Sequence, residues 1–573
     1  MSAYADFPWI ASYPPGVPAG IDTHALGTLA DFLDDAVHLY AERDAFVSGS
    51  TGAKLSYAEL DDYSGRVASY FQQVLHLPQG SRVALMMPNV LQYPVCMFGL
   101  LRAGYVVVNV NPMYTPRELE HQLRDADVCA MVVVDLFAHT LAQVIGNTPV
   151  RHVVVSGLAD MMPFFKRQAA NFMMHQVKAM VPPYDLPAAV PFRDMLSRGK
   201  RAPWHKVDLQ PDDLAFLQYT GGTTGVSKGA MLSHRNVLAN VQQVKLWCAP
   251  FVDAQQTLLS VTAIPLYHVF SLGTFLTFAA MGGTNVLVSD PRDTDALVSV
   301  LRRYRAVSLP GVHTLFHHLL DHPQIGEVDF SALRLAIAGG AAVPQAVAQR
   351  WQALTGRPLI EGYGLTECAP TVAVNPLNAP RSDGRIGLPL PSTEVAIRNM
   401  QGEDVGLGET GELCVRGPQV MQGYWRLPAQ TRAVMTEDGF LRTGDVAVMD
   451  EKGFLRIVDR LKDLVLVSGF NVYPNEIEAV VALHPGVREV AAVGRPSEAT
   501  GEELHVHVVR KSPALTEDML MAHCRQYLSA YKVPRKIVFE TALPKSAMGK
   551  VLRRALRLPE EFVESLESVE SVV

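Results

Sequence analysis

Residues 219–230 read Tyr219-Thr220-Gly221-Gly222-Thr223-Thr224-Gly225-Val226-Ser227-Lys228-Gly229-Ala230. Glycine lets the backbone approach an anion closely and turn its N–H groups toward it. The Thr and Ser hydroxyls add further donors, and Lys228 adds positive charge. This stretch predicts a loop that cradles phosphate groups, although its spacing is not that of a Walker loop. The alternative is a flexible Gly/Thr loop between a strand and a helix.

Apolar runs alternate with helical segments on both sides of this stretch, from about residue 80 to 380. Near-continuous apolar runs of this length are typical of strands buried on both faces of a sheet. Their alternation with helices predicts a doubly wound α/β domain. The predicted strands are Val83–Met87, Tyr105–Val110, Ala130–Val134, Val153–Ser156, Val286–Ser289, Ala306–Pro310 and Leu333–Ala338.

The pattern changes twice in the C-terminal part of the chain. From about Ser392 to residue 459, short strands separated by Gly turns predict a small β subdomain. After Arg460, a compact α+β domain of ordinary size is expected over residues 463–573. The large N-terminal domain is therefore expected to span residues 1–459. The expected C-terminal elements are strands at 487–494 and 504–509 and helices at 475–483 and 516–528, and those of the β subdomain are strands at 394–398, 411–416, 439–442 and 453–458.

Composition limits the class of protein. A chain of 573 residues is too long for one core, and 48% hydrophobic with 19% charged residues indicates a folded protein. The net charge of −7 and the lack of a Lys/Arg run exclude a nucleic-acid surface. The first Lys or Arg is Arg43, so no secretory signal is expected. The six cysteines form no C-x-x-C pair, which favours a reducing, cytoplasmic location.

No Asp, Glu, Lys or Arg occurs between Asp253 and Asp290. The length would be enough for a membrane span, but Pro265, His268 and several glycines interrupt the stretch. We therefore expect strand, loop, helix and strand at 258–264, 265–271, 272–281 and 284–289, in a buried or ligand-lining role.

Two glycine-containing segments follow predicted strands. In Glu361-Gly362-Tyr363-Gly364-Leu365-Thr366-Glu367, Tyr363 can stack on a planar base, Thr366 can donate to a phosphate oxygen, and Glu367 can bind Mg²⁺. In Ala338-Gly339-Gly340-Ala341-Ala342, small residues at the carboxyl end of a strand predict a ligand-docking position. The alternatives are a Gly-rich turn with a buried Tyr and a tight turn into a helix at 344–354.

Two charged positions near the C-terminus are candidates of the same kind. Asp445 follows a glycine, and its carboxylate can accept from both hydroxyls of a ribose; the alternative is a hairpin with a surface Asp. Lys550, in Pro544–Lys550, is a mobile point charge beside Gly549. The alternative there is a solvated basic tail that includes Arg553 and Arg554.

Two further patterns do not indicate sites. The sequence Gly406–Gly411 matches G-x-G-x-x-G, but it precedes a strand instead of following one, so we expect a turn. The pairs His313/His317 and His318/His322 have i,i+4 spacing without the Glu of a zinc motif. We expect these to be ordinary core or surface histidines.

Together, these segments resemble the adenylate-forming enzymes, the superfamily of acyl-CoA synthetases, luciferases and peptide-synthetase adenylation domains, over essentially the whole chain. Within it, the chain is similar to bacterial long-chain fatty-acid–CoA ligases. One departure is Leu461, where many relatives carry a second basic residue. The supporting stretches are Asn109–Glu120, Pro265–His268, Asp438–Lys462 and Val467–Pro474.

The resemblance implies a two-step reaction. A fatty carboxylate attacks the α-phosphate of ATP, and the thiol of CoA then attacks the acyl-adenylate. The Gly/Thr loop would hold the β- and γ-phosphates, Glu367 would bind Mg²⁺, and Lys550 would bridge the carboxylate and the α-phosphate. The catalytic residues implied are Lys550, Thr366, Glu367 and His268. The implied ATP-binding residues are Thr220, Gly221, Gly222, Thr223, Thr224, Gly225, Lys228, Gly340, Ala341, Tyr363, Gly364, Thr366, Asp445, Arg460 and Lys550.

The second step implies motion of the C-terminal lid domain. Residues 460–462 match the superfamily's hinge, and Lys462 matches the hinge position itself. Rotation there would withdraw Lys550 and present Ser468, Gly469 and Phe470 to the pantetheine arm of CoA. His268 would border the acyl tunnel, whose depth sets chain-length preference at ~0.8 kcal/mol per buried CH₂.

Several alternatives stay open. Met161–Pro182 has methionines, aromatics and three basic residues but no acidic one; this composition suits an interfacial helix on the inner face of the membrane, a surface helix, or a homodimer contact. The activity could instead be that of a medium-chain or aryl-acid CoA ligase, or of a fatty acyl-AMP ligase. From a different class, a non-catalytic lipid-binding relative is the alternative, but intact Lys550, Glu367 and Asp445 argue against it.

Overall fold

The computed structural model describes residues 7–162, 165, 167–168, 181–220, 227–252, 258–467, 470–497, 500–546 and 549–557. The chain divides into two compact units. The first combines Met1–Gly221, Ser227–Glu394 and Val415–Leu441, and the second combines Val395–Cys414 and Arg442–Val573. Two sheets of mainly parallel strands in the first unit and a small α+β fold at the C-terminus confirm the predicted fold class.

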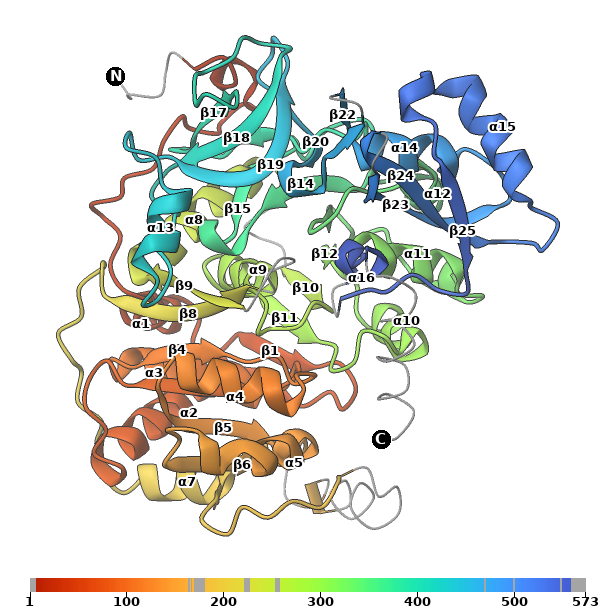
Figure 1. Cartoon of the computed structure of the whole chain (residues 1–573). Helices are drawn as coiled ribbons and strands as arrows, with labels where there is room; N and C mark the ends of the chain where they lie inside the picture. The colour runs from red at the N-terminus through yellow and green to blue at the C-terminus, as the bar shows by residue number, and fades with distance from the viewer. Residues whose placement is uncertain are drawn as a thin grey trace. The chain divides into compact units, whose positions relative to one another are not determined.

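A seven-stranded sheet, drawn mostly in orange in Figure 1, contains the first four predicted strands. Both faces of its central strands are buried, because neighbouring residues such as Leu85 and Met86 have no exposed surface. This explains their continuous apolar sequence. Its strands, in spatial order, are β7 (Val190–Pro191), β6 (His152–Ser156), β5 (Val128–Val134), β3 (Arg82–Met86), β4 (Val106–Asn109), β8 (Leu214–Thr220) and β9 (Lys228–Ser233).

A nine-stranded sheet forms the second layer of the first unit. The pairs β10–β11, β10–β12, β12–β13 and β13–β14 are parallel. The uncharged stretch before Asp290 folds as predicted into β10, helix α9 and β11. The strands in spatial order are β16 (Leu388–Pro389), β15 (Thr371–Val374), β14 (Ile360–Gly364), β13 (Leu335–Ala338), β12 (Ser308–Gly311), β10 (Leu259–Thr262), β11 (Thr284–Leu287), β1 (Asp44–Ser48) and β2 (Lys54–Ser56).

Helices connect the strands of both sheets. Four of them begin with a capping box, in which the side chains of the N-cap residue and of the third helical residue bond each other's backbone N–H: α1, α2, α4 and α8. The helices of the first unit are α1 (Leu29–Tyr40), α2 (Tyr57–Ser69), α3 (Gln92–Arg102), α4 (Pro116–Asp125), α5 (Asp135–Val144), α7 (Phe192–Gly199), α8 (His234–Cys248), α9 (Val269–Ala279), α10 (Thr294–Arg303), α11 (His313–Asp321), α12 (Gln345–Thr355) and α13 (Pro428–Val434).

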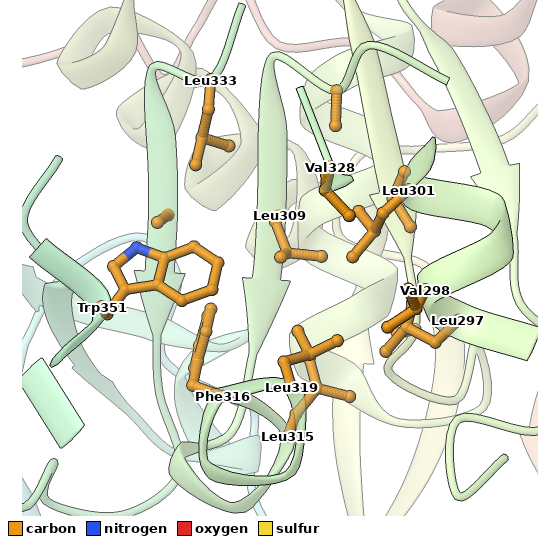
Figure 2. Close-up of a cluster of buried hydrophobic side chains, with 14 of the residues drawn as sticks. Leu297, Val298, Leu301, Leu309, Leu315, Phe316, Leu319, Val328, Leu333 and Trp351 are labelled. Carbon is orange, nitrogen blue, oxygen red and sulfur yellow. The ribbon is translucent and has the colours of Figure 1, made fainter. Parts of the chain in front are cut away.

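A hydrophobic core fixes helices α10, α11 and α12 against strands β12 and β13 (Figure 2). Phe316 of α11 meets Trp351 of α12 edge to face, with ring centroids 4.9 Å apart. Leu309 of β12 lies in the same cluster and is fully buried. Each large apolar side chain buried in this way contributes ~1.5–3 kcal/mol. The core includes Ala338 and therefore holds the end of β13, where the predicted site segment Ala338–Ala342 begins.

The predicted β subdomain is a four-stranded sheet of β17 (Glu394–Arg398), β18 (Thr410–Arg416), β19 (Leu441–Met449) and β20 (Leu455–Arg460). The predicted strand at 439–442 is wrong in extent: Gly439 has φ +83° and lies in a turn, and the strand runs from Leu441 to Met449. Most of the 406–411 stretch is a turn, as predicted: Glu409 N donates to Gly406 O at 3.1 Å, and β18 begins directly afterwards at Thr410.

The C-terminal part has one sheet with helices packed on it. Its core joins Val506 and Val508 of β24 to Ile477 of α14 and Leu520 of α15. The strands are β21 (Val465–Val467), β22 (Phe470–Val472), β23 (Val487–Ser497), β24 (Gly501–Arg510) and β25 (Lys536–Glu540), and the helices are α14 (Pro474–Ala482), α15 (Glu517–Tyr527) and α16 (Arg553–Leu556). Among the described residues, no helix is both long enough and apolar enough to cross a membrane.

Candidate active site

The segments after β10, β13 and β14 carry predicted site residues of the first unit. Because parallel strands end at one edge of a sheet, these segments lie at the same edge. They contain His268, the pair Gly340 and Ala341, and the stretch that ends at Glu367. A Cβ on Gly339 would lie 3.0 Å from the ring of Phe270, so the loop after β13 contacts the start of α9. The structure therefore brings two of these segments into direct contact.

The loop that carries Gly340 is tied to β14 by a buried carboxylate. Gly340 has φ +83°, a conformation that favours glycine. Two residues beyond Ala341, the Val343 N–H donates to Glu361 Oε2 at 3.2 Å, and the Ser382 hydroxyl donates to Glu361 Oε1. Burial raises the pKa of Glu361, which is only 4% exposed. Glu361 thus couples the Gly340 loop to the strand that carries Tyr363.

Glu367 lies in a short 3₁₀ helix, η7 (Thr366–Cys368), and its side chain is partly exposed. The Tyr424 hydroxyl donates to Glu367 Oε1 at 2.7 Å. The Lys228 Nζ lies 5.0 Å from the centroid of the Tyr424 ring, a cation–π distance. Burial and the neighbouring Glu367 raise the pKa of Tyr424, which therefore remains a hydrogen-bond donor. Tyr424 brings the predicted metal ligand and the predicted phosphate-binding lysine to one place.

Strands β8 and β9 are antiparallel, and Thr220 is paired with Lys228. The predicted phosphate loop therefore connects two strands of a hairpin, with these two residues at its base. The loop residues Gly221, Gly222, Thr223, Thr224 and Gly225 lie outside the described residues. Tyr219, at the end of β8, donates from its hydroxyl to the Asp125 carboxylate of α4.

His268 caps α9, and its Nδ1 accepts from the Phe270 N–H at 3.3 Å. Burial lowers its pKa to about 4, so the ring is neutral at neutral pH. The preceding loop is held by Asn89, whose amide donates to the carbonyls of Thr262 at 3.1 Å and Ile264 at 3.0 Å. Asn89 Oδ1 also accepts from the Leu266 N–H at 2.7 Å. His268 is therefore a rigidly placed neutral side chain.

The second unit brings Asp445, Arg460, Lys462 and Lys550 together. Asp445 and Arg460 are register partners in β19 and β20, and Arg460 Nε lies 3.1 Å from Asp445 Oδ1. Burial and the cation of Arg460 lower the pKa of Lys550 to about 8, against the opposing effect of Asp445. Burial and Arg460 also lower the pKa of Lys462 in η8 (Leu461–Asp463). Three cations are thus held around one carboxylate.

Some of the remaining predicted positions are described by the structure and others are not. Ser468 and Gly469 lie outside the described residues, and Phe470 begins β22. His313 and His317 lie in α11, and His322 pairs with Asp295 at 2.7 Å. The described part of the chain contains no group of three or more His, Cys, Asp or Glu side chains that could hold a metal.

Three residues of these clusters were not predicted from the sequence: Tyr424, Glu361 and Asn89. Tyr424 is 57 residues from Glu367 in the chain, and nothing in the local sequence around it indicates this contact. Glu361 opens the quoted Gly-rich segment, and a carboxylate in an apolar strand could have indicated a special role. Asn89 follows a predicted strand, a position where ligand-contacting or loop-holding residues occur.

The fold is that of an α/β protein with a smaller C-terminal α+β part, and comparison with known proteins gives its family. The chain belongs to the AMP-binding enzymes: the model for "AMP-binding enzyme" matches residues 33–425, and the model for "AMP-binding enzyme C-terminal domain" matches residues 476–550. The predicted resemblance to adenylate-forming enzymes is confirmed.

Two known proteins and one solved structure are similar to this chain over nearly its full length. A long-chain-fatty-acid–CoA ligase of Escherichia coli O157:H7 is 52% identical over 550 residues, which cover 96% of this chain and 97% of that protein. A 4-coumarate–CoA ligase of Pinus taeda is 28% identical, with 92% and 94% covered. The crystal structure of ATP-bound MatB from Rhodopseudomonas palustris superposes with a TM-score of 0.81 at 30% identity, with 94% and 99% covered. The predicted similarity to bacterial long-chain fatty-acid–CoA ligases is confirmed.

Proposed function

We propose that this enzyme activates long-chain fatty acids as acyl-CoA thioesters through a fatty acyl-adenylate. The observation that carries the proposal is the 52% identity to a long-chain-fatty-acid–CoA ligase, spread over 96% of the chain. In the first step, a carboxylate oxygen attacks the α-phosphorus of ATP and pyrophosphate leaves. In the second step, the sulfur of CoA attacks the acyl carbon, the thiol proton is lost, and AMP leaves.

The first unit supplies the groups that bind the nucleotide and its phosphates. Tyr363 would stack on the adenine, with Gly340 and Ala341 on its other side and Gly364 leaving room. Thr366 would donate to the α-phosphate. Thr220 and Lys228, at the base of the β8–β9 hairpin, would place the Gly/Thr loop on the β- and γ-phosphates. Displacement at phosphorus depends mainly on such positioning and on charge stabilisation.

Glu367 fits the role of a Mg²⁺ ligand. Mg²⁺ is usually bound by one or two carboxylates together with substrate phosphates and water. The Glu367 side chain is partly exposed, and the Tyr424 hydroxyl fixes one of its oxygens at 2.7 Å. When bound, the ion would neutralise negative charge on the phosphates. Tyr424 would orient the carboxylate through this hydrogen bond, as outer groups at metal sites commonly do.

The second unit supplies the ribose contact and the catalytic cation. Asp445 would accept hydrogen bonds from the ribose hydroxyls, and Arg460 orients it through the 3.1 Å ion pair. Lys550 would bridge the attacking carboxylate and the α-phosphate, where negative charge develops in the transition state. A fixed cation in a partly buried site stabilises that charge more than the same cation in water.

The second step would use the hinge at residues 460–462. Rotation about Lys462 would exchange Lys550 for the segment Ser468-Gly469-Phe470 beside the adenylate, and this segment would guide the pantetheine arm of CoA. His268 would border the acyl tunnel as a neutral group, because its pKa is about 4. A neutral side chain there leaves the tunnel wall free of charge near the fatty acid.

The test is product analysis with ATP, Mg²⁺, CoA and a series of fatty acids from short to long, with 4-coumarate and benzoate as aryl acids. CoA-dependent AMP and pyrophosphate that peak with long chains support the proposal. Product formation that peaks with medium-chain or aryl acids would indicate a medium-chain or aryl-acid CoA ligase instead. Pyrophosphate without thioester indicates a fatty acyl-AMP ligase, and binding of fatty acid without any product indicates a non-catalytic lipid-binding protein.

We further propose that the enzyme is cytoplasmic and touches the inner face of the membrane through Met161–Pro182. The support is the composition of this segment, whose basic residues are Lys166, Arg167 and Lys178. Co-sedimentation with anionic vesicles should fall when these three are replaced by Gln, while activity on dispersed fatty acid stays unchanged. Unchanged sedimentation together with a mass that halves on sedimentation velocity would instead assign the segment to a homodimer contact.

A further inference from the structure

Arg553 is not part of a solvated basic tail, which corrects one of the alternatives left open by the sequence. It lies three residues after Lys550, at the start of α16, and its side chain is only 15% exposed. Its guanidinium donates to both oxygens of Glu478 at 2.8 and 2.9 Å, and to Asn475 Oδ1 at 2.8 Å. It also lies 3.4 Å from the carboxylate of Asp463.

The partners of Arg553 come from two other elements. Asn475 and Glu478 belong to α14, and the Ala492 N–H of β23 donates to Glu478 at 2.8 Å. Asp463 is the last residue of η8 and directly follows Lys462, the proposed hinge. Burying charged groups is costly unless they are paired and hydrogen-bonded. The two carboxylates and the amide thus hold this guanidinium in one orientation.

The backbone around Lys550 forms a tight hairpin that is anchored at both ends. Lys545 and Val551 are bridged, and the Ser546 N–H donates to Lys550 O at 2.8 Å. On its first arm, Lys545 forms an ion pair with Glu489 at 2.7 Å. After the hairpin, Arg553 makes the contacts described above. The charged groups around the Lys550 amine are Asp445, Arg460, Lys462 and Arg553.

We propose that Arg553 is the positioning residue of the Lys550 hairpin: it joins the arm after Lys550 to Asp463 at the hinge and to α14, so that hinge and hairpin move as one piece. The inference rests on the proposed function, because Lys550 acts in adenylate formation. Loss of Arg553 should therefore slow the first step and spare the second, in which Lys550 is withdrawn. A displacement of about 1 Å at the reacting groups is enough to cost about 10²-fold in rate.

The test uses the full-length enzyme and measures the two half-reactions separately. Adenylation is followed as pyrophosphate release from ATP and palmitate, and thioester formation as conversion of supplied palmitoyl-adenylate with CoA. Arg553→Gln should lower adenylation about 10- to 100-fold and change thioester formation less than about twofold. Arg553→Lys keeps the positive charge but loses the planar set of hydrogen-bond donors of the guanidinium. Its adenylation rate should therefore lie between those of the wild type and Arg553→Gln. Arg554→Gln, at the exposed neighbouring position, is the matched control and should match the wild type.

The pH profile separates positioning from general loss of structure. Arg553 is one of the cations that lower the pKa of Lys550. Its removal should move the alkaline limb of adenylation to higher pH, whereas simple unfolding lowers the whole profile without moving that limb. Arg553→Lys, which keeps the positive charge, should leave the limb where it is in the wild type.

Folding is controlled by a double variant. Arg553→Gln alone leaves Glu478 buried and unpaired, so Arg553→Gln/Glu478→Gln removes both charges and should melt near the wild-type temperature. Selective loss of adenylation in this folded variant supports the inference. Equal loss of both half-reactions, or wild-type adenylation in Arg553→Gln, overturns it. A wild-type enzyme that releases no pyrophosphate with any acid would refute the proposed function itself.

Discussion

Adenylate formation should fall as the pH rises through about 8, because Lys550 loses its proton in that range. Burial and the cation of Arg460 lower the pKa of Lys550 to about 8, with Lys462 and Arg553 acting in the same direction. In the proposed first step, the charged form is the one that would stabilise the α-phosphate. With that pKa, about nine-tenths of the amine is charged at pH 7 and about one-tenth at pH 9. The first step should therefore lose most of its rate between these values.

The assay is the pH dependence of kcat/KM for ATP in pyrophosphate release, from pH 6.5 to 9.5. This parameter reports the pKa values of the free enzyme, so its alkaline limb should lie near pH 8. The limb in kcat should lie at higher pH, because the negative phosphates of bound ATP stabilise the charged amine. Conversion of supplied acyl-adenylate to thioester should lack the limb.

Two variants identify the titrating group. Lys550→Ala should reduce adenylation by about 10²–10³-fold, the usual effect of removing one transition-state charge contact, and should lose the limb. Lys550→Arg should keep part of the activity and show no limb, because a guanidinium stays charged throughout this range. A limb near pH 8 that persists in both variants, or a flat wild-type profile up to pH 9.5, would refute the reasoning.

Three further predictions test the first unit. Gly364→Ala should lower both the melting temperature and pyrophosphate release, because a Cβ there would lie 2.2 Å from the Pro370 carbonyl oxygen. Gly362→Ala is the control and should have a mild effect, because a Cβ there has no neighbour closer than 3.6 Å. Equal effects of the two substitutions would contradict the packing argument. Tyr424→Phe should lower kcat/KM for adenylation about tenfold and raise the Mg²⁺ concentration required, since a hydrogen bond to a charged group contributes ~1.5–3 kcal/mol. An unchanged Mg²⁺ titration would exclude the proposed role of Tyr424 in orienting Glu367. Burial lowers the pKa of His234 to about 4. The neutral ring therefore stabilises the fold above pH 6.5, and the free energy of urea unfolding should fall by up to ~3 kcal/mol as the pH falls toward 4. His234→Asn, which can still accept from the Leu29 N–H, should flatten that dependence, and an unchanged slope would assign it to other groups.

The parallel strands could be predicted because each is buried on both faces and therefore reads as an apolar run. The candidate site segments could be placed after these strands because ligand-binding loops follow the carboxyl ends of parallel strands. Gly340, with φ +83°, is an example in which the residue type and the backbone requirement agree. These signals lie within short stretches of sequence, so they can be read from a single chain.

The partners of the site residues could not be predicted, because they are set by tertiary packing. Tyr424 reaches Glu367 across 57 residues of sequence, and an isolated Tyr carries no information about such a contact. Arg553 shows the same limit in another way. A basic residue near a C-terminus is usually solvated, and only the arrangement of Glu478, Asn475 and Asp463 makes it a buried one.

The contacts that anchor the Lys550 hairpin suit a part that would move in the proposed rotation at Lys462. Its ion pairs go to Glu489, Glu478 and Asp463, which all follow the proposed hinge at Lys462 in the chain. Rotation about the hinge would therefore leave these pairs intact and change only what lies around the amine, Asp445 and Arg460. Breaking a buried ion pair costs ~3–5 kcal/mol, so a hairpin anchored to residues before the hinge would resist each turnover. Anchoring within the domain that would rotate avoids that cost, which accounts for a hairpin held by a residue beyond Lys550 and not by one near Asp445.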